Sequence, residues 1–335
     1  MNADIIKRIV RAIADGSQSD LERLARKVAE AERKQGHARL ADQLQEILDK
    51  PRPKKAGTQT ITDSDRGLKE LPLSRRHGEL LATVIPRESL EHHMVLPPDV
   101  EDRFARTERE YAARERLGAY GLRNRKTILL YGPPGCGKSL GAKRLGWNTG
   151  LPLLKVRFDA LISSYFGESA ANLRAVFEAA RERPCVLLLD ECDFIARSRS
   201  TSKDIGEAAR IVNSLLQLME EYDAPGLLVA TTNVESSLDN ALFRRFDEVF
   251  QVPLPGSEEI EKLLRLTLSS VHVAEQVDWG ALVRQLSGAS AAMTVKAAQD
   301  AAKAAVLSGE KVVTESLLRN AIGELRHGNG DNGQG

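Results

Sequence analysis

The spacing of apolar and polar residues changes along the chain, and its first part has a helical pattern. Three short apolar stripes at helical spacing are separated by Gly16-Ser17 and Gly36. They are Ile5, Ile6, Ile9, Val10 and Ile13; Leu21, Leu24, Val28 and Ala31; and Leu40, Leu44, Ile47 and Leu48. Three short amphipathic helices can pack as a bundle. Residues 1–50 are therefore expected to form an N-terminal helical interaction domain, or alternatively a helical extension that docks on its own chain.

A polar stretch follows and gives way to short apolar runs. It opens with Lys50-Pro51-Arg52-Pro53-Lys54-Lys55, and residues 51–79 are expected to form a linker. Five apolar runs then predict strands, each alternating with a helical segment, at residues 127–131, 153–157, 185–189, 227–232 and 249–252. This alternation is typical of a parallel sheet with helices on both faces. Residues 80–255 are therefore expected to form an α/β domain, an αβα sandwich around a five-stranded parallel sheet.

The last part of the chain returns to a helical pattern. After Pro253-Leu254-Pro255-Gly256, apolar residues predict helices as far as about residue 325. Residues 256–326 are therefore expected to form a small α-helical lid domain. Residues 327–335 are rich in Gly, Asn, Asp and Gln, which predicts a disordered tail.

Composition and charge narrow the range of partners. The 335 residues include 48 basic and 47 acidic ones, so a formal net charge of +1 indicates neither nucleic acid nor an anionic membrane as partner. No apolar run reaches the length of a membrane span, and the N-terminus has no signal-peptide pattern. Cys136, Cys185 and Cys192 are interpreted as thiols, which fits a cytoplasmic protein. The His92-His93 pair has no neighbouring ligands at metal-binding spacing.

The most specific motif lies between the predicted strand 127–131 and a helix. It reads Gly-Pro-Pro-Gly-Cys-Gly-Lys-Ser, the spacing of a phosphate-binding P-loop. Its glycines let the backbone approach phosphates, and N–H groups at a helix start bind anions. Lys138 is expected to bind the β- and γ-phosphates and Ser139 a magnesium ion. The sequence therefore predicts a nucleoside triphosphate with Mg²⁺, bound by Gly132, Pro133, Pro134, Gly135, Cys136, Gly137, Lys138, Ser139 and Leu140.

Polar residues end two further predicted strands. Asp190 and Glu191 follow the strand 185–189 in the Walker B pattern. Asp190 is expected to hold magnesium, and Glu191 to polarise the attacking water. Asn233 follows the strand 227–232 and can hydrogen-bond the γ-phosphate or the water, the sensor 1 role. The alternatives are a helix-capping Asp-Glu pair and a turn-forming Asn.

Taken together, these motifs resemble those of AAA ATPases over roughly residues 100–325. Four motifs follow one another in the order and spacing of that family: the P-loop, Asp190-Glu191-Cys192-Asp193, Ala230-Thr231-Thr232-Asn233 and Phe243-Arg244-Arg245-Phe246-Asp247. The arginine pair before a Phe is similar to the branch of microtubule-severing and membrane-remodelling ATPases. The resemblance implies ATP hydrolysis with Mg²⁺ in a homo-oligomeric ring, a hexamer. It also implies that Arg244 and Arg245 are arginine fingers acting on the neighbouring subunit's γ-phosphate; a surface salt-bridge pair is the alternative.

Two further segments resemble the same family. Ser163-Ser164-Tyr165-Phe166-Gly167-Glu168-Ser169 is similar to its central pore loop, which implies that Tyr165, Phe166 and Gly167 grip an extended polypeptide substrate. Two core aromatics are the alternative. Residues 198–206 resemble a second pore loop. Ser287-Gly288-Ala289-Ser290 resembles the Ser-Gly-Ala motif, so Gly288 and Ala289, with Gly121, are expected around adenine; Ser290 replaces the family's usual acid.

A narrower resemblance points to a partner. Val95-Leu96-Pro97-Pro98, Leu117, Gly121-Leu122-Arg123 and Gly141-Ala142 resemble bacterial AAA ATPases encoded beside subtilisin-like serine proteases, some of which act in antiviral defence or plasmid exclusion. The favoured interpretation is a ring ATPase that remodels or threads protein. The alternative is a nucleotide-dependent regulator of a partner subtilisin-like protease. A GTPase would need an Asn-Lys-x-Asp signature, which is absent, and the balanced charge disfavours a DNA-handling ATPase.

Overall fold

The chain divides into two units, residues 1–61 and 62–335. The computed structural model describes residues 72–73, 78–162, 168–192, 205–233, 244–309 and 312–330, all of them in the second unit. The predicted N-terminal helices and most of the predicted linker lie outside the described residues. So do Tyr165, Phe166 and Gly167 of the predicted pore loop, and most of the second pore-loop segment.

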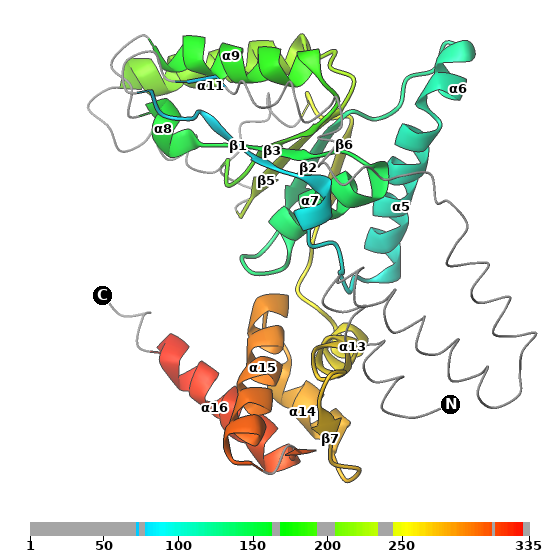
Figure 1. Ribbon diagram of the computed structural model, residues 1–335, viewed down its shortest axis with the longest axis vertical. Coiled ribbons are helices and arrows are strands. Elements are labelled where there is room, and N and C mark those ends of the chain that lie inside the picture. The colour runs from blue at the N-terminus through cyan, green and yellow to red at the C-terminus, as the bar shows by residue number, and fades with distance from the viewer. Residues whose placement is uncertain are drawn as a thin grey trace, which may run out of the picture. The chain divides into compact units, whose positions relative to one another are not determined.

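A six-stranded sheet lies at the centre of the α/β region, with the order β1-β3-β4-β5-β2-β6 (Figure 1). Its strands are β1 (Ala82–Ile85), β2 (Thr127–Tyr131), β3 (Leu153–Val156), β4 (Val186–Leu189), β5 (Leu227–Thr232) and β6 (Glu248–Gln251). The five predicted strands are β2 to β6, and all their pairings are parallel. The prediction of a five-stranded, wholly parallel sheet is wrong at one edge, where β1 pairs antiparallel with β3.

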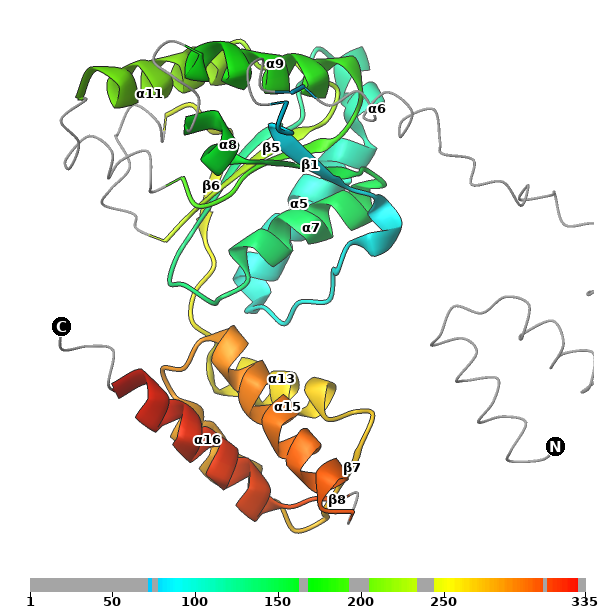
Figure 2. The same cartoon turned by 60° about the vertical axis from the view of Figure 1, so that its left-hand side comes forward.

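Helices cover both faces of this sheet (Figures 1 and 2). On one face lie α5 (Pro98–Ala112) and α7 (Lys138–Thr149); on the other lie α8 (Phe158–Ile162), α9 (Ser169–Glu182) and α11 (Ile205–Glu220). Each face has its own apolar cluster, with Phe104 and Leu145 in one and Phe177 and Leu215 in the other. Because β2, β4 and β5 are buried on both faces, their sequences are almost continuous apolar runs. None of the described helices combines the length and apolar character needed to cross a membrane.

Short connecting helices complete this region. A 3₁₀ turn, η1 (Arg87–Ser89), follows β1, and α6 (Arg114–Ala119) follows α5.

Cys136, Cys185 and Cys192 are buried free thiols. Burial raises the pKa of Cys185 to about 12.

Residues 257–330 form a smaller, mostly helical region. Its helices are α13 (Ser257–Thr267), α14 (Trp279–Leu286), α15 (Ala291–Leu307) and α16 (Glu315–Gly330), and they enclose a separate apolar cluster. The expectation of helices alone is wrong, because β7 (His272–Val273) and β8 (Val312–Val313) pair in parallel. Strands of two residues are too short to show an alternating pattern. Helix α16 ends at Gly330, inside the segment 327–335 that was predicted to be a tail.

Candidate functional site

The P-loop joins the carboxyl end of β2 to the start of α7. Gly137 precedes that helix with a φ of 96°, in the left-handed region that favours glycine. At Gly132 a Cβ would lie 2.3 Å from the Val252 carbonyl oxygen, so a larger residue would collide with backbone. The two glycines let the loop turn tightly into α7. The N–H groups in the first turn of that helix then provide an anion-binding end.

Lys138, the first residue of α7, turns its ammonium group back onto the loop. Its Nζ donates to the carbonyl oxygens of Gly132 at 2.8 Å and Pro133 at 2.7 Å. The residue is only 7% exposed. A buried cation next to a helix N-terminus strongly favours an anionic ligand such as a phosphate.

An acidic group faces the loop from the end of β4. Asp190 Oδ1 accepts hydrogen bonds from the Ser139 and Thr231 hydroxyls, both at 2.7 Å, and its Oδ2 accepts one from Lys155 Nζ at 2.6 Å. Burial alone would raise the pKa of this carboxyl, but the three hydrogen bonds outweigh it and hold the pKa below its ordinary value.

An ionised Asp190 beside the Ser139 hydroxyl offers the hard oxygen donors that Mg²⁺ prefers. The residues present therefore fit that ion, and Asp190 and Ser139 would hold it. When bound with a nucleotide, Mg²⁺ neutralises charge on the phosphates. The chain's own contribution is to present an anionic carboxylate and a hydroxyl side by side.

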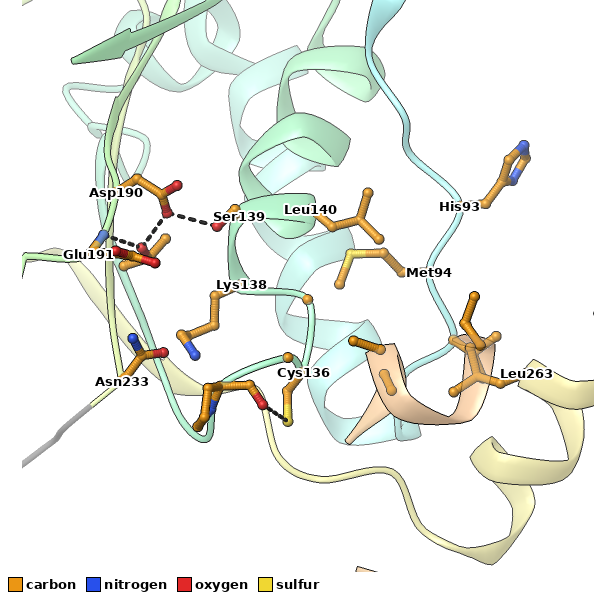
Figure 3. Close-up of a pocket in the computed structure, with 18 of the residues that line it drawn as sticks. His93, Met94, Cys136, Lys138, Ser139, Leu140, Asp190, Glu191, Asn233 and Leu263 are labelled. Atoms are coloured by element: carbon orange, nitrogen blue, oxygen red, sulfur yellow. Dashed lines mark hydrogen bonds between the residues drawn. The ribbon is translucent and has the colours of Figure 1, made fainter. Parts of the chain in front are cut away.

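Glu191 and Asn233 complete the polar side of the site. Among the described residues, Glu191 is the one non-glycine residue with a positive φ, at 56°. Its backbone N–H donates to Thr231 Oγ1 at 2.9 Å. Figure 3 shows Asp190, Glu191 and Asn233 along one side of a cavity, facing Lys138. The structure thus brings together the residues predicted for phosphate, magnesium and water; their individual roles stay predictions.

This cavity has a volume of about 450 Å³, in the range of small-molecule sites. Beyond the P-loop its wall is mostly apolar, and Figure 3 shows Met94, Leu140 and Leu263 on the side away from the acids. The apolar wall suits the flat face of a nucleobase. It is formed by His93, Met94, Val95, Leu140, Leu263, Leu266, Ala291, Ala292 and Val295.

The three residues predicted around adenine are not among the residues that line this cavity. Gly121 precedes the amino end of β2, whereas the P-loop follows its carboxyl end. Gly288 and Ala289 precede α15, and it is the start of this helix that reaches the loop, where Ala292 N donates to the Gly135 carbonyl oxygen at 2.9 Å. Their proposed contact with adenine stays a prediction.

Sequence reasoning assigned no site role to several residues of the cavity. Val95 is part of the segment that carries the narrower family resemblance, but the sequence did not indicate that it lines the site. Leu266 is an apolar residue that remains 53% exposed on α13, a feature that only the structure shows. Thr231 stands in the Ala230-Thr231-Thr232-Asn233 motif, but nothing in the sequence indicated its hydrogen bond to Asp190 from the neighbouring strand. The same holds for Lys155, which reaches Asp190 from β3.

Arg244 and Arg245 lie at a different cavity, of about 490 Å³. Arg245 pairs with Glu220, and its carbonyl oxygen accepts a hydrogen bond from the Thr127 hydroxyl at 3.2 Å. Thr127 begins β2, so the arginines lie at the amino end of this strand, whereas the P-loop follows its carboxyl end. The two ends of this five-residue strand are roughly 13 Å apart at ~3.3 Å per residue. The structure therefore does not bring the arginines to the nucleotide cavity of their own chain.

Comparison with known proteins agrees with this geometry. The family model described as "ATPase family associated with various cellular activities (AAA)" matches residues 128–254. The chain is 32% identical over 320 residues to an uncharacterized AAA family ATPase, y4kL, of Sinorhizobium fredii, which covers 95% of this chain and 94% of that protein. It is 34% identical over 212 residues to the proteasome-activating nucleotidase of Methanothermobacter thermautotrophicus, covering 61% of this chain and 52% of that protein. The P-loop cavity and the near full-length match together show that this chain is an ATPase and belongs to the AAA family.

Proposed function

We propose that this protein is a ring-forming ATPase that remodels or threads polypeptides, and that an arginine from a neighbouring copy completes each ATP site. The observation that carries this proposal is the distance of Arg244 and Arg245 from the nucleotide cavity of their own chain. Members of the AAA family usually form homo-oligomeric rings, in which one copy can supply residues to the next.

The charge at the cavity supports this proposal. Among the described residues that line it, Lys138 is the one lysine or arginine. Lys155 lies close by, but its ammonium group is paired with Asp190. Negative charge shifts between phosphate oxygens during transfer, and an arginine finger typically accelerates that step by about 10³- to 10⁵-fold. The described part of the chain offers no such arginine in cis, so a neighbouring copy is the natural source.

The loop that carries the arginines has a firm base. Asp247 Oδ2 accepts hydrogen bonds from the backbone N–H groups of Lys126 at 2.8 Å and Thr127 at 3.0 Å, which tie the loop to the start of β2. Arg245 is half-buried against Glu220, whereas Arg244 is exposed. An exposed guanidinium on a fixed loop suits a contact across a subunit interface. Arg244 is therefore the proposed dominant finger, with Arg245 as its support.

Mixing two inactive variants tests the trans site directly. Glu191→Gln keeps its arginines but loses the group proposed to polarise water, so it should bind ATP and hydrolyse it at least about 100-fold more slowly. Arg244→Ala keeps Glu191 but has no finger to lend. Each variant alone should be almost inactive, whereas the mixture should regain part of the wild-type ATPase rate. An Arg244→Ala protein that hydrolyses ATP normally, or a mixture that stays inactive, would contradict the proposal.

Action on a polypeptide is tested at Tyr165, which lies outside the described residues. Tyr165→Ala should keep ATP hydrolysis but lose ATP-dependent unfolding of a tagged test protein, because the aromatic grip is gone. Tyr165→Phe should retain unfolding, since the ring stays. If Tyr165→Ala unfolds the test protein as fast as wild type, threading through this loop is the wrong mechanism.

A second candidate function is the regulation of a partner protease, including one of the subtilisin type. One observation favours it: a relative over 61% of this chain is a nucleotidase whose name says that it activates a proteasome. Under this hypothesis, the Glu191→Gln protein with ATP should stimulate a co-purified protease as well as wild type does. If stimulation requires continued hydrolysis, the first candidate is favoured.

A further inference from the structure

Thr231 lies buried, 1% exposed, at the carboxyl end of β5, next to the two acids that follow β4. Its hydroxyl accepts a hydrogen bond from the Glu191 backbone N–H at 2.9 Å and donates one to Asp190 Oδ1 at 2.7 Å. Its own carbonyl oxygen accepts from the Cys192 backbone N–H at 2.8 Å. One residue therefore contacts three consecutive residues, Asp190, Glu191 and Cys192.

The sheet register explains why this side chain reaches Asp190. Strands β4 and β5 pair in parallel with Leu188 beside Val229, and both side chains belong to the apolar cluster on the α7 face. Side chains two residues apart share a face of a strand. Asp190 and Thr231 each stand two positions further on, so they extend the same face past the apolar core, towards Ser139 at the start of α7.

The backbone of Glu191 needs such a partner. A non-glycine residue in the left-handed region costs on the order of 1–3 kcal/mol and persists only where its surroundings hold it there. A threonine hydroxyl can hold it, because it has one proton to donate and lone pairs to accept with. Here the proton goes to Asp190, so a lone pair is available for the Glu191 N–H. The stiff χ1 of a β-branched residue fixes the direction of both bonds.

We propose that Thr231 is a positioning residue for ATP hydrolysis: its hydroxyl sets the backbone conformation of Glu191 and the orientation of the Asp190 carboxylate at the same time. This inference rests on the proposed roles of Asp190 and Glu191. Thr231 also lines the cavity, but the role proposed here acts through Asp190 and Glu191. Ser139 and Lys155 also hold Asp190, so loss of the Thr231 hydroxyl should weaken the site without abolishing it.

Three variants test this role. Thr231→Val removes the hydroxyl and keeps the shape, whereas Thr231→Ser keeps the hydroxyl. Thr107→Val is the matched control, because Thr107 is also 1% exposed and its hydroxyl donates to the Arg103 carbonyl oxygen of its own helix, α5. Mutating a residue that holds a metal ligand in place typically lowers activity or metal affinity by about 10- to 100-fold. Thr231→Val should therefore lower kcat by that factor and raise KM for ATP in the presence of Mg²⁺, while the other two variants stay within a few-fold of wild type.

A binding measurement gives a second readout that does not depend on turnover. Fluorescent ADP is titrated with and without Mg²⁺, and thermal unfolding confirms that each variant is folded. Thr231→Val should bind the nucleotide normally in EDTA and lose about 10-fold or more of the tightening that Mg²⁺ gives to wild type. Thr231→Ser should keep that tightening.

Several results would overturn the proposal. They are a Thr231→Val protein with the wild-type kcat, a Thr231→Ser protein as slow as Thr231→Val, or equal loss of nucleotide binding with and without Mg²⁺. The Glu191→Gln variant separates this failure from failure of the proposed function. If Glu191→Gln is slow but Thr231→Val is fast, Thr231 alone is misassigned. If Glu191→Gln is fast, the proposed role of Glu191 fails as well.

Discussion

At the scale of single residues, the P-loop lysine already has partners within its own loop. Lys138 donates to the Gly132 and Pro133 carbonyl oxygens, which partly replace the water lost on burial. A triphosphate offers the same ammonium group anionic oxygens instead of neutral ones. Because an ammonium group is attracted more strongly to an anionic oxygen than to a neutral carbonyl oxygen, the exchange favours binding of the nucleotide.

Removal of this charge should therefore abolish tight binding. Lys138→Ala loses two or more charged contacts of about 1.5 kcal/mol each, which predicts at least ~100-fold weaker binding of ATP. Titration with a fluorescent ATP analogue measures this. Lys143→Ala is the control on the same helix, because Lys143 forms only a partly exposed pair with Glu91. Equal affinity of Lys138→Ala and wild type would show that the phosphates bind elsewhere.

The residues that could be predicted are those whose chemistry is encoded locally. The P-loop, Asp190-Glu191 and Asn233 each stand in a short motif at the end of an apolar run, and the structure places them around one cavity. Thr231 and Lys155 could not be found in this way, because their contacts with Asp190 cross from one strand to another. A threonine in a buried strand gives no sign of which polar group it will meet.

At the scale of elements, an ion-pair group joins α5 to α7, the helix that begins at the P-loop. The Arg144 guanidinium on α7 donates to both carboxylate oxygens of Glu101 at 2.6 Å and to Glu108 at 3.0 Å, both on α5. It also lies over the Phe104 ring, 5.1 Å from its centre. Arg144 is 9% exposed, so this contact is worth more than an ordinary surface pair.

Breaking this group should destabilise the large domain in a pH-dependent way. The hydrogen bonds from Arg144 lower the pKa of Glu101 from its ordinary value of 4.5. A carboxyl group with a lowered pKa stabilises the fold at pH values above its ordinary pKa. This stabilisation is lost as the pH falls from the ordinary pKa through the lowered one. Arg144→Met should therefore lower the free energy of unfolding by about 2 kcal/mol at pH 7, discounted because Glu101 is half-exposed, and by less at pH 4.

Urea unfolding at the two pH values measures this difference. Lys303→Met is the matched control, since it breaks an exposed pair with Asp300 on α15 and should change stability by less than about 0.5 kcal/mol. A loss in Arg144→Met that is equally large at both pH values would mean that packing over Phe104, not charge, gives Arg144 its effect.

Prediction of elements succeeded where burial is two-sided and failed at the β1 edge and for the two shortest strands. Strands β2, β4 and β5 are buried on both faces, so each leaves an unbroken apolar run in the sequence. In β1 only Ala82 is buried, and an edge strand of four residues gives no clear alternation. Strands β7 and β8 are shorter still, and their pairing depends on the packing of the helices between them.

At the scale of the whole molecule, the two proposed halves of the ATP site lie at opposite ends of the strands of one sheet. The P-loop, Asp190 and Glu191 lie at the carboxyl ends of the strands, while Arg244 and Arg245 lie near the start of β2. A rigid sheet cannot bring the two ends of its strands together. A ring removes this difficulty, because each copy can then place its arginines beside the nucleotide cavity of the next copy.

Such a division makes the ATPase rate depend on assembly. The rate per subunit should fall as the protein is diluted below the concentration at which rings dissociate, because isolated copies lose the about 10³-fold or greater contribution of the finger. Light scattering and ATPase measurements on the same dilution series should show the two transitions at one concentration. Arg244→Ala should assemble alike but hydrolyse ATP slowly at every concentration. A monomeric preparation with the full rate would mean that each chain completes its own site, and the arginines near the start of β2 would then need another explanation.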